Sequence, residues 1–236
     1  MKTVLWIVGI FAVLFVLLEM KNRKERPFFQ KLEKLNADIL EGCFVKDPVS
    51  RRRFLRGLAH FTNGRMDLAQ TLFVTTARRA KAPEDEAICS YMASKTLAKT
   101  GNNDMALSYA KRAVELQPER KHIRIEYARM LARNRDEAAL DEFEKLITED
   151  PANPLLYHSY GNAYILLDSP ENAIVAFERT LELDPDFNGT HGLMMLAYAM
   201  LGDRENAAKW YNAAIEHGEN AEQLSSIMED MLAKAE

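Results

Sequence analysis

The sequence predicts an all-α protein, a right-handed solenoid of helical hairpins that follows a single N-terminal transmembrane helix. Three observations lead to this fold class. Alanines recur at intervals of 33 or 34 residues, and an uncharged apolar segment lies near the start of the chain. Helix-favouring Leu, Ala, Glu, Lys and Arg are abundant, whereas Gly (10) and Pro (8) are sparse among the 236 residues. A period of this length is typical of stacked hairpins that cannot bury their apolar faces alone.

The apolar segment spans residues 3–18 and contains no charged side chain. A helix of this length measures roughly 24 Å, and extension to Met20 brings it to about 27 Å, near the thickness of a bilayer core of about 30 Å. A secretory signal peptide is the alternative. However, the segment ends in the charged stretch 19–24 without an Ala-x-Ala motif, and Cys43 is too distant to carry a lipid. We therefore expect residues 1–20 to form an uncleaved transmembrane anchor.

The charges that flank this segment predict its orientation. Lys2 precedes it, whereas Lys21, Arg23, Lys24 and Arg26 follow it. An excess of Lys and Arg marks the cytoplasmic side of a membrane. We therefore expect a single-pass protein whose large C-terminal part is cytoplasmic, and we favour the bacterial inner membrane.

Residues 21–49 are expected to form a basic juxtamembrane segment and a capping helix. Pro27 suits the first turn of a helix over residues 27–41. Apolar residues then recur at helical spacing, namely Phe28, Leu32, Leu35 and Ile39. We expect this helix to cover the first hairpin, and the alternative is a helix that lies on the membrane surface. Residues 42–50, which include Pro48, are the expected loop before the repeats.

The net charge of −4 conceals an asymmetry between the two parts of the chain. Residues 1–82 contain 16 Lys and Arg against 7 Asp and Glu, a net of +9, and residues 83–236 contain 15 against 28, a net of −13. Anionic lipid headgroups attract basic stretches beside a membrane segment. A solvated basic face is an equally good interpretation.

The repeat is defined by residues at fixed positions. Alanines occupy one position, an aromatic residue follows four positions later in three repeats, and a proline closes three repeats. These residues are Ala106, Ala139, Ala173 and Ala207, then Phe143, Phe177 and Tyr211, then Pro118, Pro151 and Pro185.

The repeat over residues 154–187 is the clearest. Two sets of residues each share one helix face: Tyr157, Tyr160, Gly161 and Tyr164 on a first helix, then Ala173, Phe177 and Thr180 on a second. Residues 168–171 are the expected turn, with an N-cap and a proline at the start of the second helix. The small residues at Gly161 and Ala173 allow the two helices to approach closely.

These positions resemble the tetratricopeptide repeat, with matches at positions 4, 7, 8, 11, 20, 24 and 32 of that family's pattern. The resemblance extends over five hairpins, at residues 50–82, 87–120, 121–153, 154–187 and 188–221. The first is the weakest, because it has Ala69 and Phe73 but no closing proline. Residues 221–236 carry apolar side chains on one face and are the expected C-terminal capping helix.

The resemblance implies where a partner binds. In tetratricopeptide proteins the first helices of the hairpins line a concave groove, and here the peptide-binding groove would be formed by Tyr91, Lys95, Lys99, Ile125, Arg129, Arg133, His158, Asn162 and Ile165. The lysine pair and the arginine pair are each spaced by four residues, so each pair shares a helix face. Four cations followed by an apolar stretch favour a peptide with an acidic and an apolar portion. The alternative is a solvated basic face.

One known groove motif is not reproduced. Some tetratricopeptide domains bind chaperone C-termini through a Lys–Asn–Asn–Lys–Arg carboxylate clamp. This sequence has Tyr91 and Lys95 at the leading positions of its second hairpin, and Phe54 and Leu58 in its first. The resemblance therefore does not extend to the clamp of chaperone adaptors.

Motifs for catalysis are missing from the sequence, among them GxGxxG, the P-loop, HExxH, GxSxG and CxxC. We expect no enzyme activity, no catalytic or metal-binding residues, no cofactor and no small-molecule substrate. His122, His158 and His191 fall on successive first helices but lack the carboxylate support of a metal site. The acidic repeats disfavour nucleic acid as a partner. For the two cysteines we expect buried free thiols, with a single disulfide as the alternative.

The sequence thus predicts a membrane-tethered scaffold or adaptor that binds partner proteins or peptides at the cytoplasmic face of a membrane. The layout resembles that of the bacterial lipopolysaccharide-assembly scaffolds, although the cysteine-rich metal-binding segment of that family is not found in this sequence. Anchored import receptors of the mitochondrial outer membrane share the layout. Two alternatives stay open: a periplasmic envelope-assembly or chaperone-like factor, and a structural subunit of a larger membrane complex.

Overall fold

The computed structural model describes residue 27 and residues 29–235. The predicted anchor over residues 1–20 therefore lies outside the described residues. Among the helices that are described, none combines the length and the apolar character needed to cross a membrane. The chain divides into two compact units, unit 1 up to Thr96 and unit 2 from Leu97 onward, and each is described by itself.

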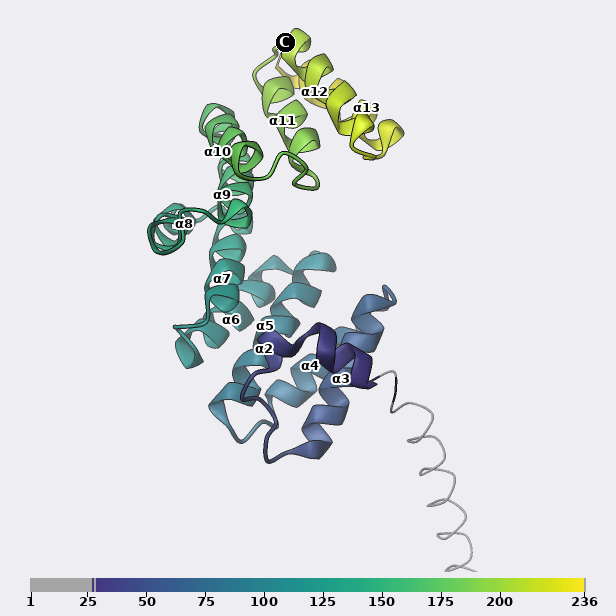
Figure 1. Cartoon of the computed structure of the whole chain (residues 1–236), viewed down its shortest axis with the longest axis vertical. Helices are drawn as coiled ribbons and strands as arrows, with labels where there is room; N and C mark the ends of the chain where they lie inside the picture. Colours follow the sequence, from purple (N-terminus) through teal and green to yellow (C-terminus); the bar gives the residue numbers. More distant parts are fainter. Residues whose placement is uncertain (1–26, 28, 236) are drawn as a thin grey trace, which may run out of the picture. The chain divides into compact units, whose positions relative to one another are not determined.

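The described part of unit 1 contains helical residues 29–35, the helices α2 (Ala37–Leu40), α3 (Pro48–Thr62) and α4 (Met66–Ala77), and most of α5 (Pro83–Lys99) (Figure 1). Unit 2 contains the end of α5 and the helices α6 (Asn103–Leu116), α7 (Lys121–Arg133), α8 (Ala138–Glu149), α9 (Pro154–Leu166), α10 (Pro170–Leu183), α11 (Thr190–Met200), α12 (Arg204–Glu216) and α13 (Ala221–Lys234). The residues that the structure describes form helices and turns, without a β-strand.

The helices pack as consecutive hairpins. Extensive contacts join α3 with α4, α7 with α8, α9 with α10 and α11 with α12. Within unit 2, α6 also contacts α7, α8 contacts α9, and α10 contacts α11, so that each hairpin stacks on the next. This arrangement is the all-α solenoid that the alanine spacing predicts.

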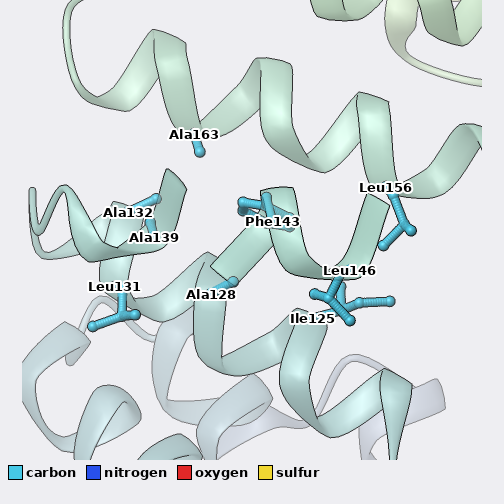
Figure 2. Packing of buried hydrophobic residues seen from close by; sticks show 9 residues of the cluster. All are labelled: Ile125, Ala128, Leu131, Ala132, Ala139, Phe143, Leu146, Leu156 and Ala163. Atoms are coloured by element: carbon cyan, nitrogen blue, oxygen red, sulfur yellow. The ribbon is translucent and has the colours of Figure 1, made fainter. Parts of the chain in front are cut away.

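The alanine ladder forms the core of the hairpins. Five alanines at the repeat position are fully buried, namely Ala69, Ala106, Ala139, Ala173 and Ala207. Figure 2 shows how one aromatic partner packs: Phe143 of α8 lies between Ala128 of α7 and Ala163 of α9. One aromatic ring thus fills the space where three helices of successive hairpins meet.

Close helix packing depends on the absence of a side chain at two positions. A Cβ atom built on Gly161 would lie 2.5 Å from a ring carbon of Phe177, and one on Gly57 would lie 2.6 Å from a ring carbon of Phe73. Both rings are fully buried and cannot easily move aside. The small residue that the sequence pattern places in the first helix therefore sets the distance to the second helix.

The turn within each hairpin uses a left-handed backbone conformation. The residues with positive φ at these five turns are Gly64, Gly101, Arg135, Asp168 and Gly202. After Asp168 (φ 62°), α10 begins with Ser169 as the N-cap and Pro170 in its first turn. The turn predicted at residues 168–171 is thus present. The Ser169 hydroxyl accepts a hydrogen bond from the Asn172 side chain at 2.9 Å instead of capping the backbone.

The segment before the first hairpin differs from the single helix predicted over residues 27–41. Helical residues 29–35 are followed by a turn at Asn36 and then by α2. The Asn36 side chain donates a hydrogen bond to the Leu32 carbonyl at 2.7 Å, and such local side-chain bonds compete with regular helix. Leu32 is buried as predicted, but Leu35 is 71% exposed, so the predicted apolar face is only partly used.

The loop before the repeats is also shorter than the predicted 42–50, because α3 begins at Pro48. The Asp47 carboxylate accepts a hydrogen bond from the Ser50 amide at 2.9 Å, and Pro48 suits the first helical turn. Within the loop, Phe44 is 2% exposed and its ring lies 5.2 Å from that of Phe54. Its backbone amide donates to the buried Asp85 carboxylate, whose pKa is raised by burial.

The two cysteines, Cys43 and Cys89, are buried free thiols. Burial raises the pKa of Cys89 well above its usual range, so this thiol stays protonated at neutral pH. The prediction of free thiols therefore agrees with the structure of unit 1.

Helix α13 covers the end of unit 2. Its Leu224 packs with Met195 of α11 and Ala214 of α12, and its Leu232 packs with Ala199 and Ala207. The final hairpin thus has a partner for its outer apolar face, as the end of a solenoid requires.

Candidate peptide-binding groove

The first helices of successive hairpins lie side by side in unit 2. Helix α7 contacts α9, and α9 contacts α11. The first helices that are neighbours in the stack are thus in contact, and the sequence places most of the groove residues on them. Those on α7 are Ile125, Arg129 and Arg133, and those on α9 are His158, Asn162 and Ile165.

The two leading groove residues belong to unit 1. Lys95 donates a hydrogen bond to the Tyr91 hydroxyl at 3.3 Å, and its ammonium group lies 5.2 Å from the centre of the Tyr91 ring. Tyr91 is 8% exposed. Lys99, one turn further along α5, is exposed and belongs to unit 2. Because Lys95 and Arg129 lie in different units, the patch of four cations stays a prediction.

The three residues on α7 differ in how much surface they offer. Ile125 is 9% exposed and packs in the core with Leu146 and Leu156. Arg129 is half-buried and Arg133 is exposed. Two of the three predicted residues on this helix are therefore available to a ligand.

A polar cavity adjoins the end of α7. Its volume is about 490 Å³, and it is lined by Thr100, Gly101, Asn102, Asn103, Asp104, Arg133 and Asn134. The cavity extends from Arg133 to the turn between α5 and α6. A ligand that reaches Arg133 would thus meet amide, hydroxyl and backbone groups and the carboxylate of Asp104 beside it.

On α9, His158 serves partly as a packing residue. Its Nδ1 atom lies 2.9 Å from the Thr190 hydroxyl, and its ring lies 4.9 Å from the Phe187 ring. Burial, together with the positive charge of Arg129, lowers the pKa of His158 to about 4. His158 is therefore neutral at pH 7, and Arg129 supplies the positive charge beside it.

The predicted groove surface becomes apolar beyond Arg129. Asn162 and Ile165, on the same face of α9, are both half-buried. On α11, Leu196 and Met200 are half-buried as well. The surface in unit 2 thus runs from arginine side chains on α7, past the amide of Asn162, to aliphatic side chains on α9 and α11.

Two further cavities lie away from the predicted groove residues. One, of about 430 Å³ in unit 1, is lined by Pro48, Val49, Arg52, Arg53, Arg56 and Leu72. The other, of about 630 Å³ in unit 2, lies among α8, α9 and α10 and is lined in part by three tyrosines. The sequence pattern assigned those tyrosines to packing within the hairpin. It gives no indication that a cavity lies between the second helices.

The described residues contain no group of three or more His, Cys, Asp or Glu arranged to hold a metal ion. His191 stacks on His217 with ring centres 3.9 Å apart, and His158 is held by Thr190 and Phe187. Two of the three histidines that fall on successive first helices are therefore engaged in packing contacts.

Comparison with known proteins bears on the fold. The family described as tetratricopeptide repeat matches residues 53–221. The chain is similar to the solved structure of TTC0263, a thermophilic TPR protein in Thermus thermophilus, with a TM-score of 0.62, 20% identity and coverage of 78% of this chain and all of that one. It is also similar to MamA from Desulfovibrio magneticus, with a TM-score of 0.54, 20% identity and coverage of 74% and 95%. At this identity the likenesses concern the fold alone.

A curated relative matches over a shorter stretch. Protein STIP1 homolog of Dictyostelium discoideum is 29% identical over 93 residues, which is 39% of this chain and 16% of that protein. The chain thus spans about a sixth of the length of this relative.

Proposed function

The chain belongs to the tetratricopeptide repeat family, and from that premise we propose that it is a membrane-tethered scaffold that recruits partner proteins at the cytoplasmic face of a membrane. Proteins with this repeat serve as protein-interaction scaffolds, and side-by-side first helices offer a surface for an extended peptide. The observation that carries the proposal is the adjacency of α7, α9 and α11 in unit 2.

The charges of this surface favour a partner segment with an acidic portion. Arg129 and Arg133 both reach the surface of α7. A guanidinium group binds carboxylates through paired hydrogen bonds, which makes arginine well suited to acidic peptides. The half-buried Ile165, Leu196 and Met200 would take apolar side chains of the same segment. The proposed partner is therefore a protein with a short acidic stretch followed by apolar residues.

The membrane tether is proposed from the sequence and from the charge of unit 1. The uncharged residues 3–18 are followed within a few residues by four cations. Unit 1 adds Arg52, Arg53 and Arg56, which line one cavity with Val49. A basic surface held near a membrane is attracted to its anionic lipids. This charge supports a cytoplasmic position for the folded part. We propose that the anchor lies in the inner membrane of a bacterium.

A periplasmic envelope-assembly or chaperone-like factor is the first alternative. Alkaline phosphatase fused to the C-terminus is active only outside the cytoplasm. We expect low phosphatase activity from this fusion and high activity from a matched cytoplasmic reporter. High phosphatase activity would favour the periplasmic alternative.

A structural subunit of a larger membrane complex is the second alternative. Gentle detergent extraction followed by native mass measurement separates the two roles. A recruiting scaffold should be recovered largely free of partners or with substoichiometric ones. A fixed complex of constant composition would favour the structural role.

The groove is tested by charge reversal in the full-length chain. We expect Lys95→Glu and Arg129→Glu, purified in mild detergent, to capture at least fivefold less partner protein from lysate than the unaltered chain. Lys111→Glu, at an exposed position of α6, serves as the control for charge alone. Equal capture by all variants would show that the groove is not the binding surface.

A further inference from the structure

The cavity among α8, α9 and α10 has the features of a second binding site. Its volume is about 630 Å³, within the range of about 300–1,000 Å³ that is usual for ligand pockets. We call it the tyrosine pocket. Its lining residues are Glu144, Ile147, Thr148, Tyr157, Tyr160, Tyr164, Asn172, Val175, Ala176 and Arg179.

The tyrosine pocket is separate from the groove of first helices. Two of its three walls come from the second helices α8 and α10. Its tyrosines follow the spacing i, i+3, i+7 along α9, whereas the groove residues on α9 are at 158, 162 and 165. The two sets therefore lie on different faces of the same helix. A peptide in the groove and a peptide in the tyrosine pocket would not compete for the same side chains.

The walls of the pocket are fixed by hydrogen bonds among its own residues. The Tyr164 hydroxyl donates to the Tyr160 hydroxyl at 2.7 Å, and Tyr160 donates to the Glu144 carboxylate at 2.9 Å. The rings of Tyr160 and Tyr164 lie 4.6 Å apart. Burial, with these hydrogen bonds, raises the pKa of Tyr160, so the phenol remains a donor. A pocket whose walls are already ordered loses little entropy when it binds a ligand.

The mouth of the pocket exposes apolar surface. Val175 of α10 is 65% exposed, and Ala176 beside it is 4% exposed. One turn further along α10, Arg179 lies 5.8 Å from the centre of the Tyr157 ring and pairs with Glu182 at 2.7 Å. An apolar side chain that enters between Val175 and the tyrosines would remove this surface from water.

The helices that border the pocket are acidic. Helices α8 and α10 carry seven carboxylates, at Asp141, Glu142, Glu144, Glu149, Glu171, Glu178 and Glu182, against two cations, Lys145 and Arg179. Both cations already form ion pairs within their own helix, Lys145 with Glu142 at 2.8 Å and Arg179 with Glu182. Glu149 is also paired, with Arg124 of α7 at 2.7 Å. The four remaining carboxylates, which include Glu144 in the pocket lining, leave the border with an excess of negative charge that a ligand of opposite charge would complement.

We propose that the tyrosine pocket binds a peptide segment of a partner protein that inserts one large apolar or aromatic side chain and places a Lys or Arg beside Glu144. Aromatic walls and an exposed valine select the apolar side chain, and the acidic helices select the cation. The proposed site prefers a basic segment, whereas the groove of first helices prefers an acidic one. It stands on the geometry of α8, α9 and α10 and does not depend on the groove.

Selection from a random dodecapeptide library on phage tests the proposal without a known partner. The bait is the full-length chain in mild detergent, and detergent micelles without protein serve for counter-selection. We expect enriched peptides in which Phe, Tyr, Trp or Leu lies within three residues of Lys or Arg. The absence of such a class, or enrichment of acidic peptides alone, would overturn the proposal.

Variants then locate the bound peptide. The most enriched basic peptide is labelled, and its Kd is measured by fluorescence anisotropy. We expect Val175→Asn to weaken binding at least fivefold and Glu144→Lys at least tenfold. The matched changes Ile215→Asn and Glu216→Lys, at exposed positions of α12, should alter the Kd less than twofold.

The groove variant Arg129→Glu tests whether the basic peptide binds in the tyrosine pocket or in the groove of first helices. Arg129→Glu should leave the Kd of the basic peptide within twofold, whatever it does to capture of acidic partners. Unchanged binding in both pocket variants, or a loss confined to Arg129→Glu, would place the peptide elsewhere and overturn the tyrosine pocket as its site.

Discussion

At the residue scale, His158 couples the stability of unit 2 to pH. Its pKa is lowered to about 4, from an ordinary value of 6.5, mainly because the ring is buried. The unfolded chain therefore binds a proton more readily than the folded one between these two values. The stability that the neutral ring allows is fully present above pH 6.5 and is lost as the pH falls toward 4.

This linkage predicts the behaviour of a variant that cannot be protonated. Between pH 7 and pH 5 the original chain should lose about 2 kcal/mol of unfolding free energy through His158. His158→Gln should lack that loss. Urea unfolding at the two pH values, followed by the fluorescence of Trp210 in unit 2, measures the difference.

His60 provides the control, since it is a half-buried histidine of unit 1. His60→Gln should leave the pH dependence of the Trp210 transition unchanged. His191 contributes to the pH dependence of the original chain and of His158→Gln alike, because burial and then the neighbouring His217 also lower its pKa. If His158→Gln loses as much stability on acidification as the original chain, His158 is not the group that titrates.

Residue patterns also show how far the sequence can predict the core. Alanines, glycines and aromatic residues at fixed spacing identify the buried ladder because they meet within one hairpin or between neighbours. Phe44 follows no such period, although it is buried against Phe54. Its burial depends on a loop folding back through the left-handed conformation at φ 57°, which single-sequence spacing does not report.

At the element scale, the hairpin turns show where local sequence decides structure. Prolines at the starts of α3, α9 and α10 and caps such as Asp47 fix where helices begin. The break at Asn36 was not predicted, because apolar spacing continues across it. In the turn of the third hairpin, the residue with positive φ is Arg135, at 57°. In the turns of the first, second and fifth hairpins, the residue with positive φ is a glycine.

The conformation of Arg135 makes a stabilising substitution predictable. A non-glycine residue in the left-handed region costs roughly 1 kcal/mol or more, and glycine avoids this cost while gaining unfolded-state freedom. We expect Arg135→Gly to raise the unfolding free energy of unit 2 by about 0.5–1 kcal/mol. Urea unfolding followed by Trp210 fluorescence measures the change.

The neighbouring Glu137 is the matched control. Its backbone has φ −64° and ψ −19°, which other residues adopt readily. Glu137→Gly should therefore lower the unfolding free energy, since glycine brings only flexibility there. Destabilisation by both substitutions would mean that Arg135 contributes contacts that outweigh its backbone strain.

At the scale of the whole molecule, the repeat explains the architecture better than it explains the site. The hairpin order follows from a pattern that is local along the chain, and the same pattern predicts which face of the first helices would form the groove. The burial of Ile125 and the contacts of His158 with Thr190 depend on neighbouring hairpins, which the pattern of one helix does not contain. The tyrosine pocket was missed for a similar reason, because its tyrosines occupy packing positions and its volume lies between second helices.

The groove and the tyrosine pocket together give the proposed scaffold two surfaces of opposite preference. In this proposal Arg129 and Arg133 would favour acidic segments on the first helices, and the carboxylates of α8 and α10 would favour basic segments on the second. The two arginines and the tyrosine pocket lie in unit 2, whereas the excess of positive charge lies in the first 82 residues. A tether at the N-terminus would leave the acidic hairpins for soluble partners.

Photocrosslinking in living cells tests the central claim, recruitment of a partner through the first-helix groove, most directly. A benzophenone amino acid replaces Asn162 in the full-length chain, and a second chain carries it at the exposed Asn212 of α12 as control. We predict a partner crosslinked at position 162 but not at 212, through a segment that contains several Asp or Glu residues. The claim would be contradicted by equal crosslinking at both positions, or by crosslinked segments that carry no acidic residues.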